Sequence, residues 1–326
     1  MISHYRAEAW EWLIRQRRHA PHNADIWDLR FHKDKYLPAL WLKVTQGKYR
    51  LSPARVHRRS LKGDAIVQWS AADALVMKWV ALKIKNSLPV QDSCVHVAGH
   101  HGGRDSLKKI TSALSEGARF VWRTDIRGYY RHIRKPMLWA HVCRFVTDPI
   151  LQSLMQQYIW YTVEDGGEFY TPPDGICRGS SLSPLPGASY LWYVDTAFAR
   201  QENLFYVRYM DDFLFLSPRR WPVRRCVKQL RDYFDLAGFE CHPDKTQLGR
   251  VDKGFDWLGV WFNADGPAGI APRAKENHRL RKLRLEEQAR RRKLSEKEIC
   301  LRVQQYERRW EGWAERQLRA ASLPAY

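Results

Sequence analysis

The hydrophobic pattern of the chain is densest at residues 205–216. The sequence there reads FYVRYMDDFLFL, so apolar and aromatic residues flank two adjacent carboxylates, Asp211 and Asp212. Short apolar runs rich in branched and aromatic residues are typical of buried strands, and Asp is favoured in turns. The pattern therefore predicts two buried strands joined by a tight turn. An exposed turn with two solvated carboxylates is the alternative that this stretch alone leaves open.

A second apolar stretch also ends in a carboxylate. Residues 120–125 read FVWRTD, which predicts a strand that ends at Asp125, 86 positions before Asp211. Adjacent carboxylates are costly to bury, and Mg²⁺ relieves that cost because it prefers carboxylate oxygens and shares its shell with substrate phosphates. Two such strands side by side would suit two metal ions in an in-line nucleotidyl transfer. Only the tertiary fold could bring them together.

Helical periodicity accounts for much of the remaining chain. It predicts helices over residues 5–20, 36–44, 71–82 and 273–318. Ser70 is expected to cap the third of these, and Ser295 with Glu298 forms a capping box inside the last. The last segment also places Tyr306, Trp310 and other aromatics on one helical stripe. The pattern therefore predicts helices at both ends of the chain.

Glycine, proline and serine mark the predicted loops. Residues 51–60 and the turn at Lys62 read as a basic hairpin, with a solvated charged surface as the alternative. Residues 175–185 read GICRGSSLSPL, a loop that opens an apolar helix. Small residues let a backbone approach a base or sugar closely, and a helix N-terminus favours anions. Gly266, Pro267 and Pro272 are interpreted as a linker.

Composition points to a partner that carries phosphates. The chain has 326 residues, 44% of them hydrophobic, and 55 Lys and Arg against 35 Asp and Glu, for a formal charge of +20. A core of useful size is therefore expected, and the excess of positive charge is typical of nucleic-acid binding. The six cysteines form no pair with zinc-ligand spacing, and no apolar run is long enough for a membrane span. We therefore expect a cytoplasmic protein with reduced thiols and no membrane association.

Five motifs in this order resemble the palm of a reverse transcriptase. They are DxxxYY from Asp125, GxxxGSxLSP from Gly175, YMDD at 209–212, DKT at 244–246 and FDWLG at 255–259. The pattern is similar to bacterial group II intron-like enzymes and their stand-alone, often defence-associated relatives. The resemblance covers about residues 50–262 and is specific, because five ordered motifs must coincide.

The resemblance implies a metal-dependent active site. Asp125, Asp211 and Asp212 are expected to be the catalytic carboxylates. Together with Ile126 they are the expected metal-binding positions for two Mg²⁺ ions, with Mn²⁺ as an alternative. Tyr130 matches the aromatic residue beneath the incoming sugar, where a flat ring leaves no space for a 2′-hydroxyl. Deoxynucleotides are therefore the expected substrates.

The resemblance also implies substrate and primer contacts. The expected substrate-binding residues are Tyr130, Arg178, Gly179, Lys245, Arg59 and Lys62, with Arg55 as a further candidate. Lys245 matches the lysine near the pyrophosphate leaving group. Residues 257–259, namely Trp257, Leu258 and Gly259, match the hairpin that grips the primer end. One departure is that Cys177 and Arg178 stand where the family usually has Pro-Gln.

These features predict an α+β fold of the right-hand polymerase type, with an antiparallel sheet and helices in the palm. The expected division is an N-terminal helical extension at 1–50, fingers at 51–124, a palm at 125–262 and a basic helical thumb at 263–326. A nuclease-like cluster or a Cys/His zinc finger after the thumb is not expected.

The expected activity is synthesis of DNA on an RNA template from a DNA or RNA primer and deoxynucleotides. A dedicated structured noncoding RNA is the expected template, in phage defence or in a mobile element. No feature of the sequence indicates which protein partners the chain has. A template-relaxed polymerase or terminal transferase, suggested by Arg178, is one alternative, and a catalytically retired RNA-binding protein is another. The presence of all three palm carboxylates argues against the second alternative.

Overall fold

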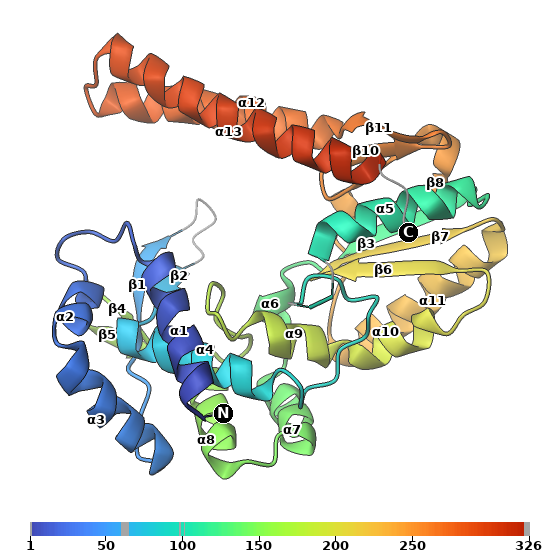
Figure 1. Cartoon of the computed structure of the whole chain (residues 1–326). Coiled ribbons are helices and arrows are strands. Elements are labelled where there is room, and N and C mark those ends of the chain that lie inside the picture. The colour runs from blue at the N-terminus through green and yellow to red at the C-terminus, as the bar shows by residue number, and fades with distance from the viewer. Residues whose placement is uncertain (1, 60–64, 98, 101, 323–326) are drawn as a thin grey trace. The chain divides into compact units, whose positions relative to one another are not determined.

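A computed structural model describes residues 2–59, 65–97, 99–100 and 102–322 of the chain. The chain divides into two compact units (Figure 1). The first unit comprises residues 1–91, 127–193 and 235–239, and the second comprises residues 92–126, 194–234 and 240–326. Each unit is described by itself. No helix in the described residues has the length and apolar character needed to cross a membrane.

The first unit is mainly helical around one small sheet. Its helices are α1 (Ile2–Gln16), α2 (Asp25–Phe31), α3 (Lys33–Thr45), α4 (Ala71–Ile84), α6 (Tyr129–His132), α7 (Lys135–Phe145), α8 (Pro149–Ile159) and α9 (Pro184–Tyr190). Its strands are β1 (Ala54–Arg59), β2 (Ala65–Gln68), β4 (Val163–Asp165) and β5 (Glu168–Tyr170), in the order β2-β1-β4-β5. The antiparallel pairing of β1 with β2 confirms the predicted basic hairpin. Its predicted turn at Lys62 lies outside the described residues.

Helix α4 forms the centre of the first unit. Most of its side chains are buried, because α1, α2 and α8 pack against it. Ser70 caps the helix as predicted, since its Oγ accepts a hydrogen bond from the Asp73 backbone N at 3.0 Å. The Asp73 carboxylate is itself buried, and burial raises its pKa. Hydrogen bonds from the Tyr49 hydroxyl at 2.8 Å and the Ser52 backbone N at 3.2 Å stabilise it.

The second unit contains a four-stranded antiparallel sheet in the order β6-β7-β3-β8 (Figure 1). Its strands are β6 (Phe205–Tyr209), β7 (Asp212–Ser217), β3 (Phe120–Asp125) and β8 (Gln247–Arg250). Three further strands form a separate sheet: β9 (Phe255–Trp257), β10 (Val260–Asn263) and β11 (Gly266–Ile270). The helices of this unit are α5 (Gly102–Ser115), most of α10 (Trp192–Ala199) and α11 (Arg220–Ala237), α12 (Pro272–Arg291), α13 (Glu296–Ser322) and two short 3-10 turns at Pro243–Lys245 and Val251–Lys253.

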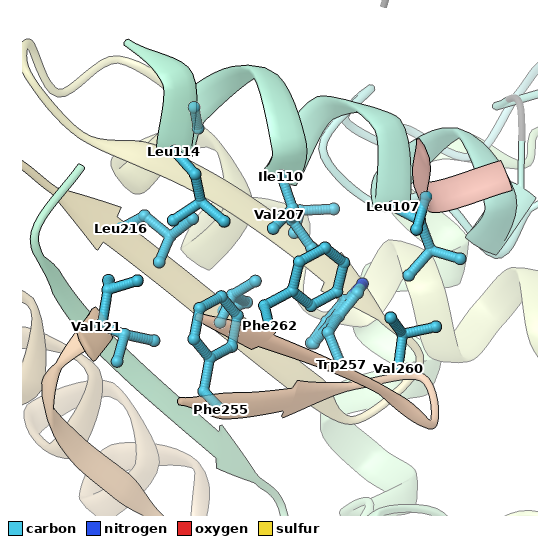
Figure 2. Close-up of a cluster of buried hydrophobic side chains, with 14 of the residues drawn as sticks. Leu107, Ile110, Leu114, Val121, Val207, Leu216, Phe255, Trp257, Val260 and Phe262 are labelled. Carbon is cyan, nitrogen blue, oxygen red and sulfur yellow. The ribbon is translucent and has the colours of Figure 1, made fainter. Parts of the chain in front are cut away.

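One core joins the two sheets of the second unit. Figure 2 shows side chains of α5, of the four-stranded sheet and of the β9–β10 hairpin pointing into the same space. Leu107 and Ile110 of α5, Val207 of β6 and Trp257 of β9 are all essentially inaccessible to solvent. The Trp257 indole also donates a hydrogen bond to the Ser106 hydroxyl at 2.9 Å, which satisfies a buried polar group. Helix α5 therefore holds the hairpin against the sheet.

The last two helices, α12 and α13, confirm the predicted helical segment, and the structure shows that they pack as a hairpin. The His278 ring of α12 stacks on the Trp310 ring of α13, with centroids 4.0 Å apart, and also on Tyr306. Ser295 forms the predicted capping box: the Glu298 carboxylate accepts hydrogen bonds from the Ser295 backbone N at 2.9 Å and from its hydroxyl. The end of α13 is anchored on α5, where the Thr111 hydroxyl donates to the Ala321 carbonyl at 2.7 Å.

One expectation about local structure was wrong, and one helix was missed. The predicted linker at 266–267 is the start of strand β11, which pairs antiparallel with β10. Proline is tolerated there because β11 lies at the edge of its sheet, where a missing N–H need not break the ladder. Helix α2 was not predicted, because seven residues are too few to show helical periodicity.

Candidate active site

The two carboxylate-bearing segments lie side by side, as predicted. Strand β3 pairs with β7 so that Asp125 is directly opposite Asp212. The Ile126 backbone N donates to the Asp211 carbonyl at 3.0 Å, so the turn of the β6–β7 hairpin lies against the end of β3. Asp125 is 1% exposed. The register pair is therefore Asp125 with Asp212, while Asp211 occupies the turn beside them.

The turn that presents Asp211 is held at its preceding residue. Met210 has a φ of 55°, a left-handed conformation that non-glycine residues seldom adopt. Its backbone N donates to Nδ1 of His96 at 3.0 Å, and its carbonyl accepts from Nη1 of Arg208 at 2.7 Å. An acceptor at Nδ1 requires the proton of a neutral imidazole to be on Nε2. Both polar groups of Met210 are thus satisfied by side chains.

Arg208 is itself fixed by a buried ion pair. Its Nε donates to Oδ1 of Asp195 at 2.7 Å and its Nη2 to Oδ2 at 2.5 Å, and the Tyr206 hydroxyl donates to Oδ1 at 2.6 Å. Burial alone would lower the pKa of Arg208, but the Asp195 carboxylate outweighs burial and raises the pKa well above its ordinary value. The guanidinium is therefore a permanent charge that fixes the turn.

Lys245, the last residue of the 3-10 turn at Pro243–Lys245, lies beside Asp125 at the end of β3. Its Nζ contacts the Asp125 carboxylate. The surrounding 3-10 turn is attached to the end of β3, because the His242 backbone N donates to the Asp125 carbonyl at 2.7 Å. A hydrogen bond of 2.8 Å between the Thr124 and Thr246 hydroxyls adds a second attachment. The structure therefore brings the predicted Lys245 to the predicted Asp125.

Asp212 has a cationic partner of its own. Nη2 of Arg123 lies 3.2 Å from Oδ1 of Asp212, and Nη1 of the same residue lies 3.2 Å from Oδ2 of Asp256. Burial raises the pKa of Asp212, and the nearby Arg123 opposes that shift while Asp211 adds to it. One guanidinium thus neutralises part of the charge of two carboxylates.

The residues present fit a divalent metal ion whose coordination shell is completed by substrate phosphates. Asp125, Asp211, Asp212 and Asp256 outnumber the cations Arg123 and Lys245 in this cluster. Within the described part of the chain, no three His, Cys, Asp or Glu side chains form a ready-made metal cage. Mg²⁺ commonly uses one or two carboxylates together with substrate phosphates, so a pre-formed cage is not required.

The 255–260 hairpin has a tight turn at the predicted primer-gripping residues. Leu258 and Gly259 have φ values of 49° and 87°, the left-handed pair that a two-residue hairpin turn favours. A Cβ at Gly259 would lie 2.8 Å from the Trp313 ring, so glycine is also required by packing. The Trp257 ring is buried and anchors the hairpin in the core of the second unit. Both turn residues are half-buried, and Leu258 packs against the core of the second unit.

The first unit brings Tyr130 together with the glycine- and serine-rich loop. The Ile176 backbone N donates to the Tyr130 carbonyl at 2.8 Å. Gly175 lies so close to this segment that a Cβ would be 2.6 Å from the same carbonyl. The Tyr130 ring lies on Gly187 of α9, where a Cβ would be 2.7 Å from the ring. Glycine at these two positions allows the close approach, and the ring is held in place by it.

The loop itself is anchored at Cys177. The Cys177 thiol accepts a hydrogen bond from the Trp69 indole at 3.2 Å, and its carbonyl accepts from the Ser183 hydroxyl at 2.5 Å. Arg178 and Gly179 follow this anchor and are exposed. The structure therefore places both predicted substrate contacts at the exposed tip of a fixed loop.

The remaining predicted substrate contacts are Arg55 and Arg59 in strand β1 and Lys62, which follows this strand in the sequence. Arg59 ends β1, but its side chain and the whole of Lys62 lie outside the described residues. Arg55 is highly exposed, and its Nε lies 3.5 Å from Glu164.

Sequence reasoning missed the residues that hold the carboxylates. They are His96, Arg123, Asp195, Arg208 and Asp256. A charge inside an apolar run was a usable signal for Arg208 in FYVRY and for Asp195 in an apolar helix, because buried charges are paired. His96 carries no such signal, since its role depends on a contact 114 positions along the chain.

Comparison with known proteins gives a family match. Residues 80–262 match the model of the family described as reverse transcriptase (RNA-dependent DNA polymerase). The chain is 26% identical over 220 residues to the Retron Mx162 reverse transcriptase of Myxococcus xanthus, covering 60% of this chain and 44% of that protein. It is 23% identical over 198 residues to Protein YkfC of Escherichia coli strain K12, covering 49% and 51%. The chain thus spans about half the length of these curated relatives.

Solved structures with a similar chain trace include two telomerases. The apo telomerase of Candida tropicalis, truncated from the C-terminal domain, aligns with a TM-score of 0.45 at 13% identity, covering 59% of this chain and 43% of that one. The telomerase of Candida albicans in complex with the TWJ fragment of telomeric RNA aligns with a TM-score of 0.45 at 14% identity, covering 59% and 36%.

We expect Asp195→Asn to destabilise the protein by about 3 kcal/mol, because it leaves the buried Arg208 charge without its partner. Urea unfolding followed by tryptophan fluorescence would measure the change. The control is Asp252→Asn, which removes an exposed carboxylate 2.8 Å from Arg250 and should leave the stability close to that of the wild type. Equal stability of the two variants would contradict a structural role for the Arg208–Asp195 pair.

Proposed function

We propose an RNA-directed DNA polymerase activity for this chain, which belongs to the reverse transcriptase (RNA-dependent DNA polymerase) family. The family model matches residues 80–262, more than half of the chain. Membership gives the chain the right-hand polymerase fold, and the mixture of helices with the antiparallel sheet β6-β7-β3-β8 agrees with it. The observation that carries the activity is the register pair of Asp125 and Asp212 beside the turn at Asp211.

Two Mg²⁺ ions, or Mn²⁺ in their place, are the proposed cofactors. Asp125, Ile126, Asp211 and Asp212 would hold them. When bound, such ions stabilise the charge on the attacking and leaving oxygens of an in-line displacement. The protein residues contribute by position: Arg208 and His96 fix the turn of Asp211, and Arg123 orients Asp212. Lys245, which contacts Asp125, would also be close enough to these carboxylates to meet a leaving pyrophosphate.

Selection of the sugar is proposed to depend on the fixed position of Tyr130 in the first unit. Its ring is supported by Gly187 and its carbonyl by Ile176, so the ring has little freedom to move aside. A rigid flat ring excludes a 2′-hydroxyl by volume alone, which favours deoxynucleotides. Arg178 and Gly179 would contact the nucleotide or the template, and Arg59 and Lys62 the triphosphate.

The parts of the chain are proposed to follow the polymerase division given above. Residues 1–50 would be the N-terminal helical extension, 51–124 the fingers and 125–262 the palm with finger elements inserted. Residues 257–259 would form the primer grip, with the buried Trp257 as its anchor and Leu258 and Gly259 as its turn. Residues 263–326 would be the basic thumb, whose described helices are α12 and α13. Exposed arginines on α12, such as Arg273, Arg281 and Arg284, would contact phosphates of a template–primer duplex. Phosphate contacts of this kind supply most of the affinity for nucleic acid.

A template-relaxed polymerase is the second candidate, favoured by one observation. Arg178 is exposed at the tip of the loop, where the family usually has glutamine. A charge there could either grip the template backbone or replace the template contact. Extension reactions with and without template would separate the two candidates.

We expect Asp211→Asn to reduce primer extension by orders of magnitude while RNA binding is roughly retained. The amide keeps the shape of the side chain but removes the charge that a metal needs. Extension of a labelled DNA primer on an RNA template, together with filter binding, would measure both properties. Asp265→Asn, an exposed residue at another hairpin turn, is the control and should behave as wild type. Full extension by Asp211→Asn would rule out the proposed site.

Sugar selection gives an independent test. Tyr130→Val should increase incorporation of ribonucleotides relative to deoxynucleotides, because it removes the ring that occupies the position of the 2′-hydroxyl. Single-nucleotide incorporation with matched dNTP and NTP pairs would measure the ratio of kcat/KM values. Tyr193→Val, an exposed tyrosine of the same unit, should leave the ratio unchanged. An unchanged ratio in Tyr130→Val would assign the gate to another residue.

A dedicated structured RNA is the proposed template. A formal charge of +20 binds phosphate backbones without selection, so productive copying needs recognition of RNA shape. The N-terminal helices and the thumb are the proposed recognition surfaces, and phage defence or maintenance of a mobile element is the proposed role. Cytoplasmic location is proposed with it.

Sequencing of RNA and cDNA that copurify with the protein from its native host should reveal one enriched RNA species and DNA complementary to it. The Asp211→Asn variant should retain the RNA and lose the DNA, since only synthesis depends on the carboxylate. A random sample of cellular transcripts would argue against a dedicated template and leave a general polymerase.

A further inference from the structure

A single guanidinium joins the two sheets of the second unit at the candidate active site. Arg123 lies on β3, two residues before Asp125. Its Nη2 contacts Asp212 of β7 and its Nη1 contacts Asp256 of β9, each at 3.2 Å. Asp212 belongs to the four-stranded sheet and Asp256 to the three-stranded sheet. The two carboxylates are therefore linked through Arg123.

The link continues into the turn of the β9–β10 hairpin. Oδ1 of Asp256 accepts a hydrogen bond from the Gly259 backbone N at 3.0 Å, while Oδ2 is the atom that contacts Arg123. Both oxygens of Asp256 are thus used, one on the hairpin turn and one on the guanidinium. A shift of Arg123 would consequently act on the turn at Leu258 and Gly259.

Burial makes this contact stronger than an ordinary surface ion pair. The side chains of Arg123, Asp212 and Asp256 are 12%, 24% and 15% exposed. Partly buried charges are screened less by water and salt than exposed ones, so the attraction to Arg123 and the repulsion between the two carboxylates both count. The planar fork of arginine can serve both carboxylates at fixed geometry, which the single ammonium of lysine cannot.

We propose that Arg123 is a positioning residue that sets the place of the primer-gripping hairpin relative to the carboxylate turn. This inference rests on the proposed polymerase function and deepens it. The guanidinium holds Asp212 on one side and the Asp256–Gly259 turn on the other, so that a primer end held by the hairpin is presented to Asp125 and Asp211. Arg123 touches neither primer nor nucleotide in this role.

The experiment uses the full chain with Arg123→Met, Arg123→Lys, Asp256→Asn and the Arg123→Met/Asp256→Asn double variant. The control is Arg250→Met, an arginine on the neighbouring strand β8 whose carboxylate partner Asp252 is exposed. Primer placement is read from the fluorescence of 2-aminopurine at the primer 3′ end in EDTA, which requires no metal. Duplex affinity in EDTA, kcat and KM for extension, and the thermal midpoint complete the measurements.

Arg123→Met should change the 2-aminopurine signal and lower kcat about tenfold, the equivalent of about 1.4 kcal/mol. Duplex affinity should stay within about twofold, because phosphate contacts elsewhere supply most of it. Arg123→Lys should recover only part of kcat, since lysine restores the charge but not the fork. Arg250→Met should match wild type in every measurement.

The double variant separates positioning from simple loss of charge. In the wild-type background Asp256→Asn should lower kcat, because it breaks the link to the turn. In the Arg123→Met background the same change should raise kcat or leave it unchanged, because the two carboxylates then only repel each other. Lowering of kcat by the same factor in both backgrounds would overturn the proposal.

Two further outcomes would also overturn it. If Arg123→Met keeps the wild-type fluorescence and kcat, the hairpin is placed without Arg123. If its loss of kcat is fully matched by a lower thermal midpoint and is restored by cooling, Arg123 has a role in stability alone. Failure of the wild type itself to extend any primer would overturn the proposed function, and this inference with it. The two failures are therefore distinguishable.

Discussion

Charge compensation at the end of β3 is the constraint on which the second unit depends. Asp125 and Asp212 face each other across two paired strands, and Asp211 follows in the adjoining turn. Carboxylates this close repel each other, and burying them without cations is costly. Lys245 reaches Asp125 and Arg123 reaches Asp212, so each strand has its own cation. The compensation is partial, because the carboxylates of this cluster outnumber these two cations, and the proposed divalent ions would complete it.

Holding this cluster requires rigid support on both sides. The left-handed residue Met210 is gripped by His96 and Arg208, and Arg208 is locked by the buried Asp195. Interiors packed at crystal-like density transmit small shifts, so the core formed by α5, the sheet and the β9–β10 hairpin keeps these contacts in register. Supporting residues of this kind orient a site without entering its chemistry.

The first unit also holds its candidate substrate-binding residues on rigid supports. Its loop at residues 175–179 is fixed through Cys177 and through the carbonyl of Tyr130, while Arg178 stays exposed. Glycines at 175 and 187 are required because backbone and ring approach too closely for a Cβ. The proposed exclusion of a 2′-hydroxyl by Tyr130 depends on this rigidity, since a ring that could rotate away would exclude nothing.

The sequence by itself determined the strands at 120–125, 205–209 and 212–217, the helical structure after residue 272 and the motifs of the candidate site, because these depend on local periodicity and on residue type. Only the tertiary structure decided that Asp125 is opposite Asp212, that Lys245 reaches Asp125 and that Arg123 joins two carboxylates. Strand register and ion pairing depend on packing between segments far apart in the chain, which local patterns do not encode. For the same reason β11 read as a linker: its Gly and Pro indicate a break, and its pairing with β10 exists only in the folded sheet.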